Sequence, residues 1–344
     1  MKNHKNYLID ILKLVAAIFA IFAYLQPFKG ISDIANFFIS FVLGRAAVPF
    51  FFVASAYFFF RKLDLHEESE PRNRLYLKGY LWRQVKLYLI WTTIYIVPIV
   101  YDLAQAKFRL AAFGTLVRNF FFTGSYYHLW VFPAMMLSTV LVYIMMHKLR
   151  PIRVLEIGLA LFIVGMMINV YKPVLYEIPV LKQIVKGYLT VFGSARNGLF
   201  YGTIFTLLGA YIAQTPVSTN REFYIKRMLV SALLLLLETF FIKGLGLLTA
   251  STYMFISLIP LLYYGFCLIL TFNIKYHRRF VNYRSYSILI YFLFAFFAWM
   301  ITLLPISLNN FFTTLVVMVI VVDLAYFIYS ISQRKEFRIL RNLY

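Results

Sequence analysis

Ionisable side chains inside long apolar segments are the residues of this sequence that could do chemistry. Arg45 lies in the middle of the apolar segment Phe37–Phe60, and Glu238 directly follows a run of five leucines. Charges are costly in hydrocarbon, so such groups line a cavity, bind a ligand or pair with each other. Arg45 is therefore the first candidate for a site residue, and an ion pair between Arg45 and Glu238 is the structural alternative.

The first apolar segment carries a second set of polar groups on one face. Lys13 and Tyr24 are eleven residues apart, which is close to three helical turns, so both project from one stripe about 16 Å apart. Asp10 is three residues before Lys13, and the two charges are expected to neutralise each other. This helix would present a cation near one membrane surface and a phenol deep in the membrane.

Three further residues have both a structural and a functional interpretation. Arg83 and Lys86 lie one turn apart at the start of an apolar segment, where basic residues commonly anchor a helix at the cytoplasmic surface. The same pair could bind the phosphates of a cytoplasmic ligand. His128 precedes Leu129 and Trp130, a pattern typical of a headgroup-level anchor. The single cysteine, Cys267, lies in an apolar segment, and no metal site is predicted.

The elements that must position these residues are membrane-spanning helices. Hydrophobic residues make up 62% of the 344 positions and charged residues only 14%, which leaves too little polar surface to cover a water-soluble globule. The net charge of +21 comes from short basic clusters between apolar segments rather than from one patch, so nucleic-acid binding is not expected. Membrane lipid is the expected solvent.

About ten segments approach the roughly 20 apolar residues that a helix needs to cross the hydrocarbon core. They are Tyr7–Phe28, Phe37–Phe60, Val85–Tyr101, Leu129–Met146, Val154–Tyr171, Gly198–Gln214, Leu229–Ile242, Thr252–Phe272, Ser287–Leu304 and Phe311–Ile331. The prediction is an all-α, polytopic transmembrane helical bundle that forms a single domain over residues 1–344. Basic residues of the connections fall mainly on the side of the N-terminus, which predicts that both termini are cytoplasmic.

Several motifs, taken in order along the chain, resemble membrane acyltransferase family 3. The run Arg45–Tyr57 is close to the family's arginine, proline, double-phenylalanine, serine-glycine pattern, with Ala56 in place of the glycine. Ile9–Ala17 looks like the opening of the family's first helix, His128–Trp130 like the start of its fourth, and Asn197–Gly202 like its sixth. The resemblance extends over the whole chain. This family includes bacterial cell-envelope O-acyltransferases and the membrane domains of vancomycin-resistance serine racemases.

The resemblance implies transfer of an acyl group from a cytoplasmic acyl-CoA, such as acetyl-CoA, to a cell-envelope glycan or lipid acceptor. The family places a histidine eleven positions after the first-helix cation, where this chain has Tyr24, and another in the ninth helix, where it has Phe294. Tyr24 would then act in place of the histidine, with Lys13 and Arg45. The remaining expectations concern ligands: Arg83 and Lys86 would bind the donor, and the substrate path would be lined by His128, Glu238 and Arg196.

Two other functions are compatible with the same sequence. A catalytically degenerate member of the family would bind or pass an envelope glycan or lipid, or support a partner enzyme. An ion-coupled transporter would use Arg45 and Glu238 as its coupling pair. In each case the chain is expected in a cell membrane, with lipid as its surroundings.

Overall fold

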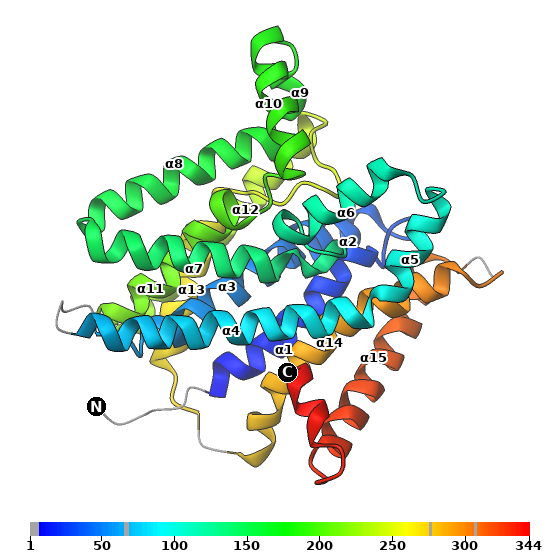
Figure 1. Cartoon of the computed structure of the whole chain (residues 1–344). Coiled ribbons are helices and arrows are strands. Elements are labelled where there is room, and N and C mark those ends of the chain that lie inside the picture. Colours follow the sequence, from blue (N-terminus) through cyan, green and yellow to red (C-terminus); the bar gives the residue numbers. More distant parts are fainter. Residues whose placement is uncertain (1–6, 65–68, 275–276, 306–307) are drawn as a thin grey trace. The chain divides into compact units, whose positions relative to one another are not determined.

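A computed structural model describes residues 7–64, 69–274, 277–305 and 308–344 of the chain. Within these ranges the regular secondary structure is helical throughout, as predicted (Figure 1). Among the described residues, six helices are long and apolar enough to cross a membrane, or seven when the bent pair α4 and α5 is taken as one span. The all-α, polytopic class is therefore confirmed for the described residues, while the total of about ten spans and the side of each terminus stay predictions.

The helices follow one another in this order: α1 (Tyr7–Leu25), α2 (Asp33–Asn36), π-helix η1 (Phe37–Leu43), α3 (Gly44–Phe60), α4 (Glu70–Ile94), α5 (Ile96–Gln105), α6 (Leu110–Phe122), 3-10 helix η3 (Tyr127–Trp130), α7 (Val131–Lys148), α8 (Pro151–Asn169), α9 (Lys172–Leu175), α10 (Pro179–Phe192), π-helix η4 (Gly198–Gly202), α11 (Thr203–Gln214), α12 (Arg221–Gly244), α13 (Leu258–Thr271), α14 (Arg278–Thr302), α15 (Asn310–Ser332) and 3-10 helix η5 (Arg338–Leu343). Each of the ten predicted segments is helical over most of its length.

Four of the predicted segments start six or more residues away from the start of their helix: the third, seventh and ninth helices begin earlier than predicted, at Glu70, Arg221 and Arg278, and the eighth begins later. The third segment was expected from Val85, but α4 begins at Glu70, because Pro71 occupies its first turn, where the missing N–H of proline costs nothing. The eighth was expected from Thr252, but α13 begins only at Leu258. Six residues of that apolar segment therefore belong to the preceding loop.

Prolines account for the main irregularities of the long helices. Pro98 cannot donate the usual hydrogen bond to the carbonyl of Ile94, and the chain bends by 55° between α4 and α5 at this place. Pro49 lies inside α3 and likewise cannot bond to the carbonyl of Arg45. The π-helix η1 directly precedes this turn, and such widened turns occur frequently at functional sites.

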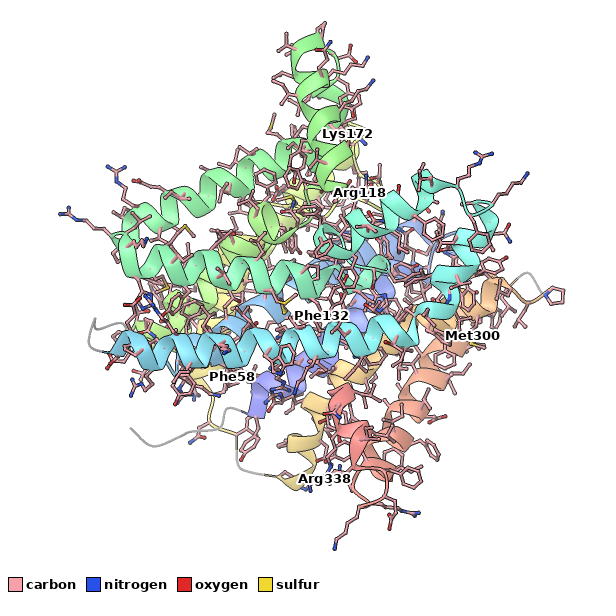
Figure 2. All side chains as sticks on the ribbon, viewed as in Figure 1. Phe58, Arg118, Phe132, Lys172, Met300 and Arg338 are labelled. Atoms are coloured by element: carbon pink, nitrogen blue, oxygen red, sulfur yellow. The ribbon has the colours of Figure 1, made fainter. Side chains whose placement is uncertain are left out.

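The chain forms two compact units. The first comprises Met1–Phe51, Ser218–Ile225 and Gly265–Tyr344, and the second comprises Phe52–Val217 and Lys226–Tyr264. In the first unit, α14 packs along α1 and α15 (Figure 1). In the second, α7, α8, α11 and η4 pack against one another, and α4 packs on α7. Phe132 of α7, labelled in Figure 2, is 2% exposed and its ring lies 5.7 Å from that of Tyr88 on α4.

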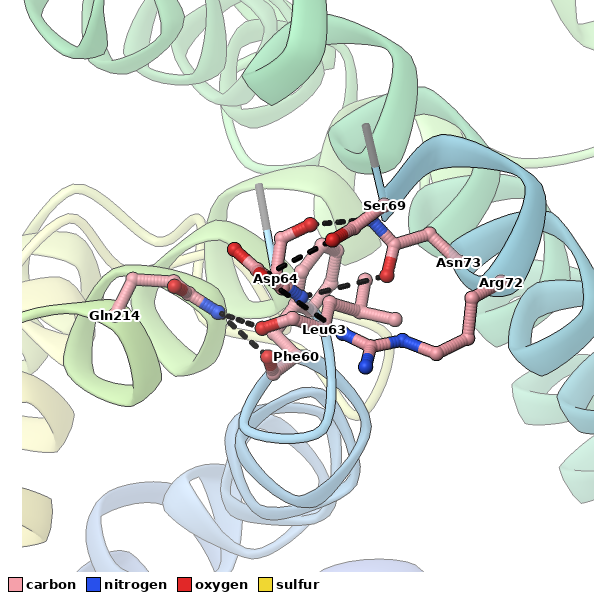
Figure 3. A network of polar contacts seen from close by, with 7 residues as sticks. All are labelled: Phe60, Leu63, Asp64, Ser69, Arg72, Asn73 and Gln214. Atoms are coloured by element: carbon pink, nitrogen blue, oxygen red, sulfur yellow. Dashed lines mark hydrogen bonds and ion pairs between the residues drawn. The ribbon is translucent and has the colours of Figure 1, made fainter. Parts of the chain in front are cut away.

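A polar network joins the residues that follow α3 to the start of α4 (Figure 3). Asn73 donates to the carbonyl oxygen of Asp64 at 2.5 Å and accepts from the Asp64 amide at 3.3 Å. Gln214, the last residue of α11, donates to the carbonyl oxygen of Phe60 at 2.6 Å. Because the last carbonyls of a helix have no partner within it, these bonds satisfy the end of α3 and hold the start of α4 beside it.

Helix α1 and the start of α3 approach each other closely at Gly44. A Cβ at this position would lie 2.7 Å from the Cβ of Ala23, on α1. The Ser40 hydroxyl donates to the Phe22 carbonyl oxygen at 3.0 Å and closes the same crossing from η1. Tyr24 and Arg45 are the next residues of the two helices, so this crossing sets them at the same depth in the unit.

Gly44→Ala is expected to destabilise the protein, because the new methyl group would force α1 and the start of α3 apart. Overpacking of this kind costs about 1–3 kcal/mol. The measurement is the midpoint of thermal unfolding of the purified protein in detergent. Gly79→Ala on α4 is the matched control, since a Cβ there meets nothing within 4 Å, and its midpoint should stay level or rise slightly. Equal midpoints for the two variants would contradict the close crossing.

Candidate functional site

Tyr24 lies at the end of α1 against an aromatic ring of α14. Its ring meets that of Phe294 edge-on, with 5.3 Å between the ring centres. Phe294 is 2% exposed, whereas Tyr24 is 39% exposed. The side of Tyr24 that faces α14 is therefore apolar, and the ring remains accessible on another side.

Helix α1 ends at Leu25 because of the residues that follow it. Gln26 adopts a left-handed conformation, with φ of 49°, and Pro27 cannot continue the hydrogen-bond ladder. Asn310, at the start of α15, donates to the carbonyl oxygens of Leu25 and Gln26 at 2.9 and 3.3 Å. These bonds satisfy the end of α1 and fix the last turn, which carries Tyr24.

The predicted ion pair within α1 is present. The Lys13 ammonium nitrogen lies 3.9 Å from the Asp10 carboxylate, and the side chains are only 12% and 20% exposed. Arg284 of α14 also lies close enough for its charge to act on Asp10. Lys13 is thus partly neutralised, and the polar stripe of α1 runs from this pair to Tyr24.

Arg45 is buried in the first turn of α3. Its side chain is 3% exposed, and its guanidinium carbon lies 5.1 Å from the centre of the Phe41 ring, one turn earlier in η1. A cation over an aromatic face is stabilised by the quadrupole of the ring, and more strongly when water is excluded. The prediction that Arg45 avoids the lipid is supported by this burial.

Arg83 and Lys86 both lie on the exposed side of α4. The Lys86 ammonium nitrogen is 5.4 Å from the centre of the Trp82 ring. Exposed cations one turn apart are accessible to the phosphates of a ligand, and they are equally suited to lipid headgroups.

Arg196 occupies an aromatic cage in the second unit. Its guanidinium carbon is 3.9 Å from the ring centre of Tyr253, 4.7 Å from that of Trp130 and 5.0 Å from that of Tyr127. The hydroxyl groups of Tyr127 and Tyr253 are hydrogen-bonded to each other. Three segments distant in sequence, η3, the turn before η4 and the loop before α13, are thereby joined by one cation.

Asn197 holds Arg196 in this position. The Asn197 side chain accepts from the Phe200 amide at 3.0 Å, which caps η4, and donates to the Tyr188 hydroxyl of α10 at 2.6 Å. Burial raises the pKa of Tyr188 to about 12, so its phenol is neutral at all physiological pH values. It can therefore accept from Asn197 while it donates to the Ser194 carbonyl oxygen at 3.2 Å.

His128 is buried rather than placed at a surface. It is 3% exposed, and its ring lies 4.8 Å from Tyr95 and 6.3 Å from Tyr126. An anchor at headgroup level would keep its polar edge in water. The burial of His128 in the second unit therefore argues against its structural interpretation as a headgroup-level anchor.

Glu238 of α12 accepts hydrogen bonds from the loop before α13. Its two carboxylate oxygens accept from the backbone amides of Ile256 and Ser257, at 2.8 and 2.9 Å. These amides precede the first turn of α13, where N–H groups have no partner within the helix. A carboxylate at this place is also favoured by the helix dipole. The backbone amides therefore supply the partner that the Glu238 carboxylate needs. Because these amides donate to Glu238, the loop is held in front of α13 and the helix starts only at Leu258.

Comparison with known proteins identifies the class of this arrangement. The family model described as an acyltransferase domain matches residues 6–330. The chain belongs to acyltransferase family 3. The family match spans both compact units and includes all the candidate residues above.

Three curated relatives are similar to this member of the family. Two are named amino-acid racemase, from Enterococcus faecalis, with 24% identity over 65% of this chain and 26% over 71%. The third is a serine/alanine racemase from Enterococcus gallinarum, with 24% identity over 71%. The aligned parts make up 30 to 34% of the relatives, so this chain matches about a third of their length. No solved structure matches the chain.

The acyltransferase-3 resemblance placed histidines at the positions of Tyr24 and Phe294, and the structure brings these two positions into contact. Tyr24, Lys13 and Arg45 belong to the first unit, and Arg83, Lys86, His128, Arg196 and Glu238 to the second. Within the second unit, Arg196 stacks on Tyr127 and Trp130, the residues on either side of the His128–Leu129 pair. Of these residues and the others described, no three His, Cys, Asp or Glu side chains gather as metal ligands would.

Sequence reasoning missed the residues that position the candidates. Gly44 allows the crossing of α1 and α3, and Asn197 caps η4. Neither role gives a periodic pattern in the sequence. Tyr143 and His147, four residues apart near the end of α7, were also missed although their spacing puts them on one face. Their contacts are described below.

Glu238→Ala is expected to destabilise the second unit, because it leaves the amides before α13 without their charged acceptor. Bonds of this kind to a charged group contribute about 1.5–3 kcal/mol each. The readout is the thermal unfolding midpoint in detergent. Glu156→Ala serves as control, since Glu156 forms an exposed pair with Arg153 on α8, worth about 0–1 kcal/mol. A Glu238→Ala protein as stable as the control would show that the capping role is wrong.

Proposed function

We propose that this protein transfers a small acyl group, of acetyl size, from a cytoplasmic acyl-CoA to a hydroxyl group of a cell-envelope glycan or lipid. The observation that carries the proposal is the crossing of α1 and α3 at Ala23 and Gly44, which sets Tyr24 at the depth of a buried Arg45. Helix α3 holds the clearest family motif, Arg45–Tyr57, and α1 holds the segment that looks like the opening of the family's first helix. The cell membrane is the place where such a protein would act.

The acyl transfer needs stabilisation of a developing oxyanion. The acceptor hydroxyl attacks the thioester carbonyl carbon, the new C–O bond forms, the C–S bond breaks, and the hydroxyl proton ends on the leaving thiolate. Negative charge grows on the carbonyl oxygen before the C–S bond breaks. A neutral phenol can donate a hydrogen bond to this oxygen, and a buried guanidinium can stabilise the charge without reorganisation of solvent. Tyr24 and Arg45 are assigned these roles.

The donor and the acceptor are assigned to different parts of the chain. Arg83 and Lys86, exposed on α4, would bind the phosphates of the acyl-CoA. Arg196, among the rings of Tyr127, Trp130 and Tyr253, and the adjacent His128 would line the path of the acceptor. Aromatic rings and a cation suit a sugar or a lipid headgroup. Membrane lipid surrounds the exposed apolar side chains of the spanning helices.

A second candidate is a family member without catalysis, which binds or passes an envelope glycan or lipid or supports a partner enzyme. The contact of Tyr24 with Phe294 favours it, because neither ring is a base at neutral pH. An ion-coupled transporter is not proposed, because Glu238 serves as a cap for the loop before α13.

Tyr24→Phe separates the first two candidates. The variant loses one hydroxyl and keeps the ring on Phe294, so the fold should persist. Removal of one oxyanion donor lowers kcat by about 100-fold or more, and that loss is expected here. The assay is release of CoA thiol from acetyl-CoA by protein in lipid nanodiscs supplied with envelope glycolipids.

Tyr326→Phe is the matched control, because Tyr326 is 64% exposed on α15. It should keep the full rate. Turnover that is equal in Tyr24→Phe and the unmodified protein would remove Tyr24 from the mechanism. If the unmodified protein binds acetyl-CoA or glycolipid without turnover, the second candidate is correct.

A further inference from the structure

Two buried polar groups lie side by side near the end of α7, outside the candidate site. The rings of Tyr143 and His147 are 4.2 Å apart between centres, and Tyr143 is 6% exposed. The Tyr143 hydroxyl oxygen and the His147 Nε2 atom are both covered by protein. Within the described part of the chain neither atom has a hydrogen-bond partner. Such groups cost about 1–3 kcal/mol each when left unsatisfied, which calls for an explanation.

The tautomer of His147 follows from its other nitrogen. Nδ1 lies 2.8 Å from the backbone carbonyl oxygen of Tyr143. A carbonyl oxygen can only accept, so Nδ1 carries the hydrogen, and in the neutral ring Nε2 is then an acceptor. The bond from Nδ1 to this carbonyl, one turn earlier in α7, fixes the orientation of the ring. It explains Nδ1 but leaves Nε2 and the Tyr143 hydroxyl unexplained.

The pair lies beside the start of α4. The charges of Glu70 and Arg74 are close enough to act on the Tyr143 phenol, and α4 packs on α7. Glu70 and Arg74 form an ion pair at 2.7 Å whose side chains are 43% and 70% exposed. A surface pair of this kind contributes little stability, so a ligand could displace it at small cost. By the expected topology, this end of the helices is cytoplasmic.

We infer that Tyr143 and His147 bind a secondary amide of an extended ligand that enters from the cytoplasm. The amide N–H donates to Nε2 of His147, and the Tyr143 hydroxyl donates to the amide carbonyl oxygen. One acceptor and one donor on adjacent turns match the two ends of a single amide group. This inference rests on the proposed function, since the pantetheine arm of an acyl-CoA carries secondary amides.

The test compares CoA with 3′-phospho-ADP, which has the phosphates of CoA but no pantetheine arm. Binding of each to the full chain in lipid nanodiscs is measured by calorimetry. Tyr143→Phe deletes the donor. His147→Asn keeps an N–H for the Tyr143 carbonyl but lacks an acceptor at the Nε2 position, whereas His147→Gln places an amide oxygen there.

Tyr143→Phe and His147→Asn are each expected to weaken CoA binding about tenfold and to leave 3′-phospho-ADP unchanged, while His147→Gln stays within about twofold of the unmodified protein. One lost hydrogen bond is sufficient for a change of this size. Equal binding of CoA by all variants would overturn the amide site and leave the proposed function standing. Equal weakening of both ligands would also overturn the site, since the arm would not be involved. If the unmodified protein binds neither ligand, acyl-CoA is not the donor and the proposed function falls first.

Discussion

A charge inside an apolar helix must find its partner within the protein, because hydrocarbon offers none. The chain meets this constraint in a different way for each charge. Lys13 pairs with Asp10 one turn away, and Glu238 accepts from the amides before α13. Arg45 and Arg196 lie over aromatic rings. Glu238 thereby fixes the start of α13, and Arg196 joins three segments of the second unit, so these charges organise the fold as well as the candidate site.

The irregular backbone of the chain is concentrated beside these charges. The π-helix η1 leads into Arg45, and η4 follows Arg196. Pro49 frees the carbonyl of Arg45 from the usual helical bond. Widened turns need compensation from side chains, which Ser40 and Asn197 supply. The regular α-helical hydrogen bonding is thus interrupted next to the two arginines whose side chains point into the protein.

Much of the architecture could be predicted because helical spans depend on local composition. The ten apolar segments, the class of fold and the pair of Lys13 with Asp10 follow from hydropathy and spacing alone. The start of α13 could not be predicted in this way, since Thr252–Ser257 are as apolar as a helix but are held as a loop by Glu238, a residue of another helix. The crossing at Gly44 also depends on a tertiary contact, for which one sequence carries no periodic signal.

The central claim is that the helices around Tyr24 and Phe294 still form an acyltransferase frame, that is, the arrangement in which the family uses two histidines. Replacement of both residues by histidine tests this claim. The measurement is release of CoA thiol from acetyl-CoA, with water as acceptor, by the double variant Tyr24→His with Phe294→His in lipid nanodiscs. An intact frame predicts a rate at least about tenfold above that of Tyr24→Phe, which lacks both the phenol hydroxyl and an imidazole, with a pH midpoint near that of imidazole, about 6.5. A double variant that unfolds at the same temperature as the unmodified protein and releases thiol no faster than Tyr24→Phe would contradict the claim.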